Sequence, residues 1–415
     1  SASPECFFAL DGEQIYSQPM KGTASRESDP ATDLAQRDWL AASTKNQAEN
    51  LMITDMVRND LGRIAVPGSM QVSKLFAMEQ YPTVWQMTSR VEARTQASVT
   101  DIFRQLFPAA SITGAPKRAS MTHIQGLESS PREIYTGAIG YIAPKRQAHF
   151  NIAIRTALMD NASGVARYGA GGGVVWDSKP EEEHAELITK TQILNQAIAW
   201  EEFALFETMA WSLQTGPKRL DQHLQRMGAS AQYFGLVFDR SRALEAIAME
   251  VGCLDCSASE ARFRLRLTLD GAGDFAAQLE PAPESAMGPQ TLALVPWRVN
   301  SQDPCLHHKT THRDVYIRAR KSVAQVHKPE HVEPLLVNER GEITETDIAN
   351  VVFKLAGQLY TPPQRCGLLP GVMREALLRR GELQERVLGL EQLADVEAFY
   401  LVNDLRGWRD ATLLS

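Results

Sequence analysis

A change of pattern near residue 200 divides the sequence into two parts. Upstream, PEEEHAELITKTQILNQAIAW has the periodicity of a long helix, and downstream, EEFALFETMAW has the alternation of a strand. With 415 residues, the chain is also longer than one ordinary domain. We therefore expect two domains, residues 1–199 and residues 200–415. Both parts mix helical and strand patterns, so the expected fold class is α/β or α+β.

Composition limits the classes of function. The formal net charge is −7 and there is no basic run, so we expect no nucleic-acid partner. No apolar run is long enough to cross a bilayer, and the first residues lack the pattern of a signal peptide. Cys253 and Cys256 form a CxxC without a second pair, which favours small apolar thiols over a metal or redox site. We expect a cytoplasmic protein that does not bind membranes.

Local patterns predict several elements. Residues 43–63 are predicted to form a helix in which Thr44 and Gln47 have the spacing of a capping box. Residues 149–158 alternate strictly, which predicts a half-buried strand with Arg155 on its polar face.

The second part has its own local patterns. Residues 219–235 are predicted to form a helix, and residues 261–271 a strand that ends in an Asp-Gly turn. Residues 333–345 have the pattern of a hairpin that turns at an Arg-Gly pair.

Three carboxylates of the first part are candidates for a metal site. Glu49 opens a helical stripe that Met52 continues, and a carboxylate facing a core is costly unless it is paired or bound to a cation. Glu183 and Glu186 are three residues apart and share a helix face. Mg²⁺ prefers one or two carboxylates together with substrate oxygens, so two separate helices could supply it. The alternative for each glutamate is a solvated acidic face.

A glycine-rich segment, GAGGGVV, contains Gly171, Gly172 and Gly173. Consecutive glycines let backbone N–H groups approach a carboxylate or phosphate closely. The alternative is a flexible turn. The segment does not have the GxGxxG spacing of a dinucleotide site.

Taken together, the motifs of the first part resemble one family. In order, they are SPECF, PMKGT, AENLMITDMVRNDLGR, SITGAPKRASM, YTGAIGYI, NIAIRTA and GGGVVWDSKPEEEHAE. This series, over roughly residues 3–197, resembles the chorismate-utilising enzymes, which include the anthranilate, isochorismate and aminodeoxychorismate synthases. The resemblance implies a layered α/β fold in which Mg²⁺ binds Glu49 and Glu186, with Glu183 nearby. It also implies that Arg155 and the backbone at Gly171–Gly173 hold carboxylates of the substrate.

Lys21, in PMKGT, points to one branch of that family. Anthranilate synthases carry alanine at this position, whereas aminodeoxychorismate synthases carry a lysine that is thought to attack C2 of chorismate. Loss of the C4 hydroxyl then lets ammonia enter at C4. The resemblance therefore implies that Lys21 is a nucleophile, which requires its neutral form. The alternative is a surface lysine in a turn.

The first part departs from the family pattern in three places. Ala109 and Ala110 stand where the family usually has two glycines, and Gln86 stands where many members have a histidine that could act as a general acid. The family also has a further N-terminal stretch that completes its fold and contacts an amidotransferase. We expect the chorismate domain of this chain to lack that portion.

A histidine-rich segment, CLHHKTTHRDVY, contains Lys309 in the second part. His307 and His308 are adjacent and would point to opposite faces of a strand, so only His308 and His312 share a helical spacing. A zinc site needs three or four ligands of defined spacing. The segment therefore favours a covalent role for Lys309 over a metal site.

The motifs of the second part resemble a second family. They are LFETM, RLDQHLQRM, HHKTTHRDVY, EITETDIANVVF, LYTPP, GLLPGVMR and YLVNDLRG. Over roughly residues 203–410 this order resembles the class IV pyridoxal phosphate (PLP) enzymes, which have a two-subdomain fold. The resemblance implies that Lys309 binds PLP, that Glu345 pairs with the pyridine nitrogen, and that Asn350 is a cofactor-site residue. It also implies that Arg226 and the backbone of Val372–Met373 hold the phosphate.

Other residues of the second part are expected near the substrate or cofactor. Thr208 lies on the expected substrate side, and Arg262 and Arg264 alternate with apolar residues, so one polar strand face could meet a carboxylate. The alternative for the arginines is a solvated face. Asp404 stands where many class IV relatives have serine or threonine in the phosphate site.

The two resemblances together imply one pathway. The first domain would convert chorismate and ammonia into 4-amino-4-deoxychorismate (aminodeoxychorismate), and the second would remove pyruvate to give 4-aminobenzoate. We expect Mg²⁺ and PLP as cofactors, a glutamine amidotransferase subunit as a partner, and a homodimer formed through the PLP domain. One alternative is a class IV aminotransferase fused to another chorismate-branch enzyme. Another is a non-catalytic first domain that recruits a partner or stabilises a dimer.

Overall fold

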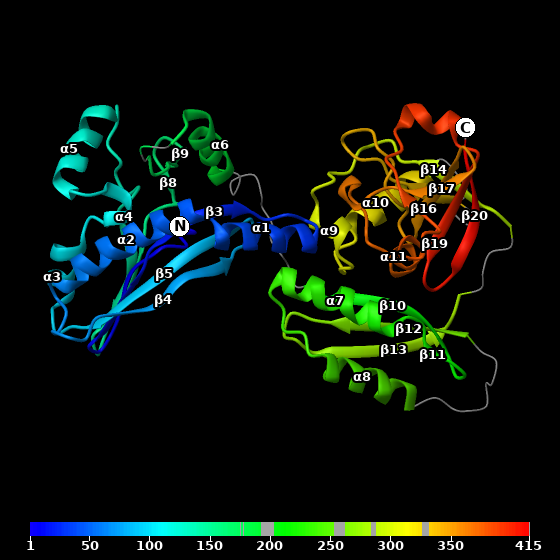
Figure 1. Ribbon diagram of the computed structural model, residues 1–415, viewed down its shortest axis with the longest axis horizontal. Coiled ribbons are helices and arrows are strands. Elements are labelled where there is room, and N and C mark those ends of the chain that lie inside the picture. The colour runs from blue at the N-terminus through cyan, green and yellow to red at the C-terminus, as the bar shows by residue number, and fades with distance from the viewer. Residues whose placement is uncertain are drawn as a thin grey trace. The chain divides into compact units, whose positions relative to one another are not determined.

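The computed structural model describes residues 1–174, 176, 178–191, 203–252, 262–283, 288–325 and 332–414. The chain separates into two compact units, one of residues 1–26 and 34–199 and the other of residues 27–33 and 200–415 (Figure 1). The expected boundary between residues 199 and 200 and the predicted CxxC at Cys253 and Cys256 lie outside the described residues. The mixed α/β class that the sequence predicts is confirmed.

Residues 1–191 form a strand-rich first part with helices between the strands. The elements are β1 Cys6–Asp11, β2 Gln14–Gln18, β3 Met20–Ser25, α1 Pro30–Ala42, α2 Thr44–Gly62, β4 Gln71–Gln80, β5 Val84–Arg94, α3 Val99–Leu106, α4 Ala110–Thr113, α5 Lys117–Leu127, β6 Ala138–Ala143, β7 Gln147–Ile152, β8 Ala157–Asp160, β9 Val165–Tyr168 and α6 Pro180–Thr191.

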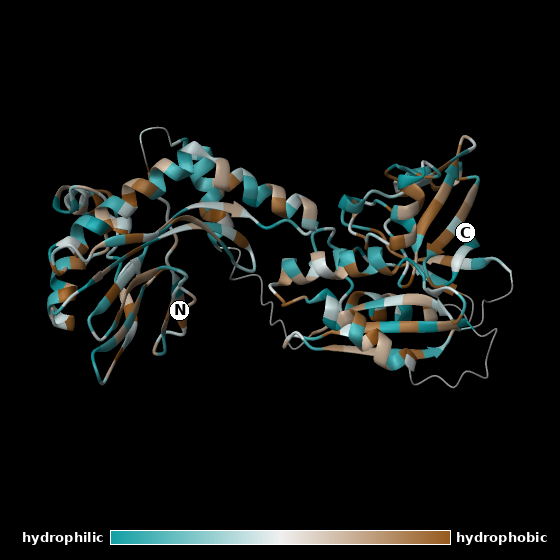
Figure 2. Ribbon diagram, turned by 60° about the horizontal axis from the view of Figure 1, so that its bottom comes forward, coloured by the Kyte–Doolittle hydropathy of each residue, from teal (hydrophilic) through white to brown (hydrophobic). Residues whose placement is uncertain are grey.

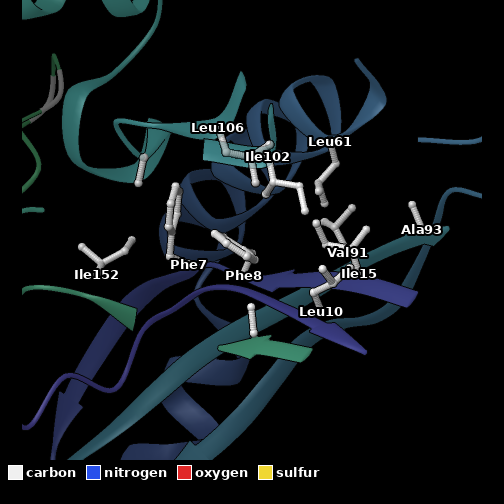
Figure 3. Packing of buried hydrophobic residues seen from close by; sticks show 12 residues of the cluster. Phe7, Phe8, Leu10, Ile15, Leu61, Val91, Ala93, Ile102, Leu106 and Ile152 are labelled. Atoms are coloured by element: carbon white, nitrogen blue, oxygen red, sulfur yellow. The ribbon is translucent and has the colours of Figure 1, made fainter. Parts of the chain in front are cut away.

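An antiparallel sheet organises the first unit. Its strand order is β3-β5-β2-β1-β7-β6, with β4 also paired to β5, and β8 and β9 form a separate hairpin. Its core lies between this sheet and the helices α2 and α3, where Phe7, Phe8, Ile15 and Ile102 are buried together (Figure 3). Burial of these side chains fixes the sheet against α2, and β3 carries Lys21 on the same scaffold.

The helix predicted for residues 43–63 is present, but its details differ from the expectation. Ser43, not Thr44, caps it, because the Ser43 hydroxyl accepts hydrogen bonds from Asn46, and Gln47 donates instead to the Ala41 carbonyl. The expected apolar stripe is wrong at Met52, which is 49% exposed, and right at Ile53, which is buried. The buried face carries Asn50, Ile53, Thr54, Asp60 and Leu61.

The strand predicted for residues 149–158 is shorter than expected. β7 ends at Ile152, and Arg155 lies in an irregular segment with a positive φ of 48°. Alternation of hydropathy cannot reveal where a strand leaves its sheet, because the pairing partner decides that point.

Residues 203–414 contain two further sheets with their helices. The elements are β10 Leu205–Ser212, β11 Gly216–Pro217, α7 Leu220–Phe234, α8 Arg240–Gly252, β12 Arg262–Leu269, β13 Phe275–Pro281, β14 Gln290–Leu294, α9 Pro304–His307, α10 Asp314–Ala324, β15 Val332–Leu335, β16 Asn350–Leu355, β17 Gln358–Thr361, the 3-10 helix Gln364–Cys366, α11 Val372–Arg379, β18 Gln384–Glu385, the 3-10 helix Leu390–Asp395, β19 Ala398–Asn403 and β20 Gly407–Leu413.

The smaller sheet of the second unit has the order β11-β10-β12-β13. Leucines of β12 pack with apolar residues of α7 and α8, while Arg264 and Arg266 on the same strand face a cavity. This alternation of hydrophobic and hydrophilic residues along strands is visible in Figure 2. The predicted helix at residues 219–235 and the strand at residues 261–271 are confirmed.

The larger sheet of the second unit has the order β15-β14-β20-β19-β16-β17-β18. The predicted hairpin turn is confirmed: the Gly341 N–H donates to the Asn338 carbonyl at 3.0 Å, and Gly341 has a φ of 78° that glycine adopts without strain. Within the described ranges, none of the helices has the length and apolar character that crossing a membrane requires.

Candidate active sites

A cavity of about 280 Å³ lies in the second unit. Its wall comes from β10, β12, α7, the segments before and after α10, the N-terminus of α11 and the turn between β19 and β20. Eight residues that the sequence predicts for this site line the cavity: Thr208, Arg226, Arg264, Lys309, Glu345, Asn350, Val372 and Asp404.

Lys309 lies between α9 and α10, and its backbone is fixed to the smaller sheet. The Phe206 N–H donates to the Lys309 carbonyl at 2.9 Å, and the Lys309 ammonium lies 4.7 Å from the centre of the Phe206 ring. Burial, followed by the charges of Arg226 and Arg313, lowers the pKa of Lys309 to about 7. A large share of this amine is therefore neutral near neutral pH and can act as a nucleophile or base.

Glu345 is buried in the wall of the same cavity and is held from three directions. Tyr316 Oη donates to its Oε1 at 2.7 Å, Asn350 Nδ2 to its Oε2 at 3.1 Å, and the Leu369 N–H to Oε1 at 3.1 Å. Burial raises the pKa of Glu345 to about 7 despite these hydrogen bonds. A carboxyl so constrained can accept a proton from, or donate one to, a ring nitrogen placed against it.

A chain of buried charges extends from Arg226 across the cavity wall. Arg226 Nε and Nη2 donate to the two oxygens of Glu207 at 2.9 and 2.5 Å. His223 Nδ1 lies 2.7 Å from Glu207 Oε2, and its Nε2 lies 3.1 Å from Asp404 Oδ2. Asp404 in turn pairs with Arg219. This chain fixes the plane of the Arg226 guanidinium, and Arg226 also donates to the Pro370 carbonyl at 2.9 Å.

The charges in this chain reinforce one another. Burial alone would raise the pKa of Glu207, but Arg226 and His223 lower it to about 2. Burial opposes the charged form of His223, yet Glu207 and Asp404 raise its pKa above the ordinary 6.5. Sequence analysis missed Glu207 and His223. The available signal was a glutamate between apolar residues on a strand and a histidine one helical turn before Arg226.

We expect His223 to titrate above pH 6.5 because it is held between two carboxylates. Its contribution to stability is complete below pH 6.5 and is lost as the pH rises through the higher folded pKa. NMR of the histidine ring protons over a pH series measures this value directly. Asp404→Asn should lower the pKa of His223. A titration midpoint of His223 at or below 6.5 in the native protein would contradict its interaction with the two carboxylates.

The N-terminus of α11 completes the wall next to Arg226. Gly371 is the N-cap of this helix, and a Cβ on Gly371 would lie 2.0 Å from Asn350 Oδ1, so a larger residue would displace the Asn350 amide. Val372 lines the cavity, whereas the Met373 side chain packs against a separate apolar cluster. The free N–H groups of a helix N-terminus and the fixed guanidinium together suit a phosphate.

The three histidines around Lys309 do not converge. His307 Nε2 lies 2.8 Å from the Ser301 carbonyl, and His308 Nδ1 lies 2.9 Å from Ser230 Oγ. The His312 ring lies 5.8 Å from the ring of Phe203. In the described part of the chain, no group of three or more His, Cys, Asp or Glu residues is arranged to hold a metal ion.

In the first unit, the structure places Lys21 beside the glycine-rich segment. A Cβ on Gly173 would lie 2.8 Å from Lys21 Nζ, and one on Gly172 would lie 3.0 Å from Glu183 Oε2. Lys190 Nζ lies 2.7 Å from Glu186 Oε1 and donates to the Gly171 carbonyl at 3.0 Å. The segment 171–173 therefore borders an ammonium group on one side and α6 carboxylates on the other.

The remaining predicted residues of the first unit have varied surroundings. Gln86 is buried and donates to the Gly22 carbonyl at 2.8 Å, so it fixes the backbone next to Lys21. Burial raises the pKa of Tyr168, and the nearby charge of Arg155 opposes this rise in part. Glu49 is half-buried on α2. Ala109 and Ala110 are buried in the apolar core and at the start of α4.

Comparison with known proteins finds a separate match for each part of the chain. Residues 1–196 match the chorismate binding enzyme family, and residues 204–414, about half of the chain, match the amino-transferase class IV family.

Individual relatives match only one part. The chain is 44% identical over 192 residues to aminodeoxychorismate synthase component 1 of Salmonella typhimurium, covering 46% of this chain and 42% of that protein. It is 37% identical over 199 residues to anthranilate synthase component 1 of Saccharolobus solfataricus, covering 48% of this chain and 47% of that protein. The chain thus spans less than half the length of either relative.

A 4-amino-4-deoxychorismate lyase structure from Pseudomonas aeruginosa is 22% identical with a TM-score of 0.42, covering 51% of this chain and 83% of that one. Because the class IV match covers about half of the sequence, the chain belongs to the amino-transferase class IV family, and it carries in addition a part that matches the chorismate binding enzymes.

Proposed function

We propose that this protein makes 4-aminobenzoate, a folate precursor, from chorismate in two steps. The first unit adds ammonia to chorismate and forms aminodeoxychorismate, and the second unit releases pyruvate from that product. One observation carries the proposal: a cavity lined by Lys309, Glu345 and Arg226 occurs in one chain with a part that matches chorismate binding enzymes. The 44% identity of that part to an aminodeoxychorismate synthase component supports this branch.

PLP fits the residues of the second cavity. Lys309 supplies an amine for its C4′ carbon, Glu345 a carboxyl for the pyridine nitrogen, and Asn350 holds that carboxyl in place. Arg226 and the backbone at Val372–Met373 would hold the phosphate. When bound, PLP supplies a ring that accepts the electrons of the adjacent carbon–hydrogen bond.

The residues of the cavity divide the work of the lyase step. The substrate amine would first replace Lys309 at C4′, which frees Lys309 Nζ. Lys309 Nζ then takes the proton from C4 of the substrate, because burial keeps much of this amine neutral. The same amine, or a water molecule, then gives a proton to the departing enolpyruvate. Thr208 lines the cavity, and we propose that it contacts the substrate. Aromatisation of the ring drives the step forward.

For the first unit we propose that Lys21 is the nucleophile and that Glu49 and Glu186, with Glu183 nearby, would hold Mg²⁺ together with a chorismate carboxylate. The described glutamates do not form a three-residue metal cluster by themselves, so the substrate would have to supply ligands. The backbone at Gly172 and Gly173 passes close to Glu183 and Lys21, which supports their use for the same substrate. Arg155 binds a second carboxylate.

Partners follow from the same chemistry. A glutamine amidotransferase subunit supplies ammonia, and two copies of the chain associate through their PLP units. We propose that the protein acts in the cytoplasm.

One experiment tests the proposal directly. The full chain is incubated with chorismate, ammonia and Mg²⁺, with and without PLP, and the products are identified by mass. We expect aminodeoxychorismate without PLP and 4-aminobenzoate plus pyruvate with it. Anthranilate or isochorismate would assign the first unit to another branch. Failure to bind chorismate with Mg²⁺ would favour a module that recruits a partner or stabilises a dimer.

The alternative for the second unit is an aminotransferase, because family membership alone allows it. An exchange assay with an amino acid and a 2-oxo acid separates the two activities. Rapid exchange without pyruvate release from aminodeoxychorismate would favour the aminotransferase.

We expect Glu49→Gln and Glu186→Gln each to weaken Mg²⁺-dependent chorismate binding by at least about tenfold, since a neutral amide is a poor ligand for a hard cation. Titration of chorismate at several Mg²⁺ concentrations measures the effect. Glu181→Gln is the matched control, because Glu181 is exposed on the same helix as Glu186. Unchanged Mg²⁺ dependence in both variants would show that these carboxylates belong to a solvated face.

A further inference from the structure

Five arginines line the cavity of the second unit: Arg226, Arg264, Arg266, Arg313 and Arg406. Two of them already have carboxylate partners, since Arg226 pairs with Glu207 and Arg264 pairs with Glu280. The other three form no ion pair with a carboxylate in the part of the chain that the structure describes.

Arg313 and Arg406 both lie near the segment around Asp347. Arg313 caps α10, donates to the Asp347 carbonyl, and stacks 4.4 Å from the centre of the Tyr316 ring. Arg406 lies in the turn between β19 and β20, and Asp347 is among the charges that act on it. Two elements far apart in sequence thus bring two guanidinium groups to one end of the cavity.

The carboxylates at this end are already engaged. Asp347 pairs with Arg320 at 2.6 Å, and Glu333 pairs with Arg409 at 2.7 Å. Both pairs have their cation outside the cavity wall, and among the described residues Arg313 and Arg406 line the cavity without an ion-pair partner of their own. Burial and then Arg409 lower the pKa of Arg406, and Glu333 and Asp347 oppose this only in part, so an anion bound beside Arg406 would favour its charged form.

These charges are not needed for a cofactor phosphate. Arg226 and the N-terminus of α11 provide that site, and Glu345 faces a different part of the cofactor. Arg313 is close enough to Lys309 and Glu345 to influence both pKa values, so an anion bound to it lies within reach of the reacting amine. Both guanidinium groups are half-buried, and such groups bind carboxylates more strongly than fully exposed ones because less water competes with them.

We propose that Arg313 and Arg406 form a carboxylate subsite that selects substrates carrying two carboxylates, with Arg406 as the specificity-determining residue. This inference rests on the proposed lyase function, whose substrate has one carboxylate on the ring and one on the enolpyruvyl group. An amino-acid substrate with a single carboxylate leaves one of the two arginines without a partner. The subsite therefore favours aminodeoxychorismate over ordinary amino acids.

The test measures equilibrium binding to the PLP-loaded full chain with a chelator present, so that Mg²⁺-dependent binding to the first unit does not contribute. The probes are 3-(carboxymethoxy)benzoate, which has two carboxylates, and 3-methoxybenzoate, which has one. Arg406→Ala should weaken binding of the dicarboxylate by about tenfold or more and change binding of the monocarboxylate less than about twofold. Arg406→Lys should restore part of the loss, since it keeps the charge.

Arg318→Ala is the matched control, because Arg318 is exposed on α10 and stacks 4.3 Å from the centre of the Trp297 ring. It should leave both affinities unchanged. Dicarboxylate binding to Arg406→Ala as tight as to the native chain would overturn the proposal. An equal loss of affinity for both probes, or for PLP itself, would also overturn it and assign Arg406 to packing or to the cofactor.

The binding result and the lyase assay separate the two proposals. If Arg406→Ala loses the preference for the dicarboxylate, the subsite is supported. If the native chain also never releases pyruvate from aminodeoxychorismate, the lyase function is refuted. Where the lyase is active, the KM for aminodeoxychorismate should rise in Arg406→Ala while kcat changes much less, because the interaction forms on binding.

Discussion

Lys309→Ala is expected to abolish 4-aminobenzoate formation, with a loss of more than about 10²-fold, as when a general base is removed. The same change should remove the visible absorption that PLP gains when it is joined to a lysine. The reason is chemical: among the groups in the cavity wall, the Lys309 amine is the one that can bond to C4′ of PLP. Absorption spectra and product analysis with supplied aminodeoxychorismate measure both effects.

Two controls separate this role from a metal role. His312→Ala should be much milder, because its ring packs against Phe203 and does not line the cavity. A chelator should leave the lyase step intact. If a chelator inhibits the lyase step and Lys309→Ala keeps a normal absorption band, the histidine-rich segment would be a metal site instead.

Lys21→Ala is expected to block amination of chorismate by on the order of 10³-fold or more, the size of effect seen when a nucleophile is removed. The lyase step on supplied aminodeoxychorismate should be unaffected, because Lys309 lies in the other compact unit. Mass analysis of products from chorismate and ammonia, with a parallel lyase assay, measures both steps.

Gly173→Ala provides a second variant for the same hypothesis. The added Cβ would lie 2.8 Å from Lys21 Nζ, so the amine must move and amination should fall while the lysine is retained. Normal amination by Lys21→Ala would show that Lys21 is not the nucleophile. Normal amination by Gly173→Ala alone would show that the lysine side chain adapts.

The sequence predicted the helices and strands best where they depend on contacts between near neighbours. The helix Leu220–Phe234 and the strand Arg262–Leu269 were predicted because apolar residues recur at the period of each element. Met52 and the end of the strand at Ile152 were predicted wrongly. Which helix face becomes buried, and where a strand stops pairing, depend on elements far away in the sequence.

The same division applies to the candidate sites. The sequence by itself determined the two-part organisation and the chemical groups at Lys309, Glu345 and Arg226, because covalent and acid–base chemistry requires particular residue types. It did not reveal that Glu207 and His223 fix Arg226, or that Asp404 joins them from a position 181 residues after His223. Only the tertiary structure decided these partners, and it also placed Arg313 and Arg406 in the cavity wall, without ion-pair partners among the described residues. Burial strengthens charge interactions and makes an unpaired charge costly, and burial is a property of the folded chain that no short sequence pattern contains.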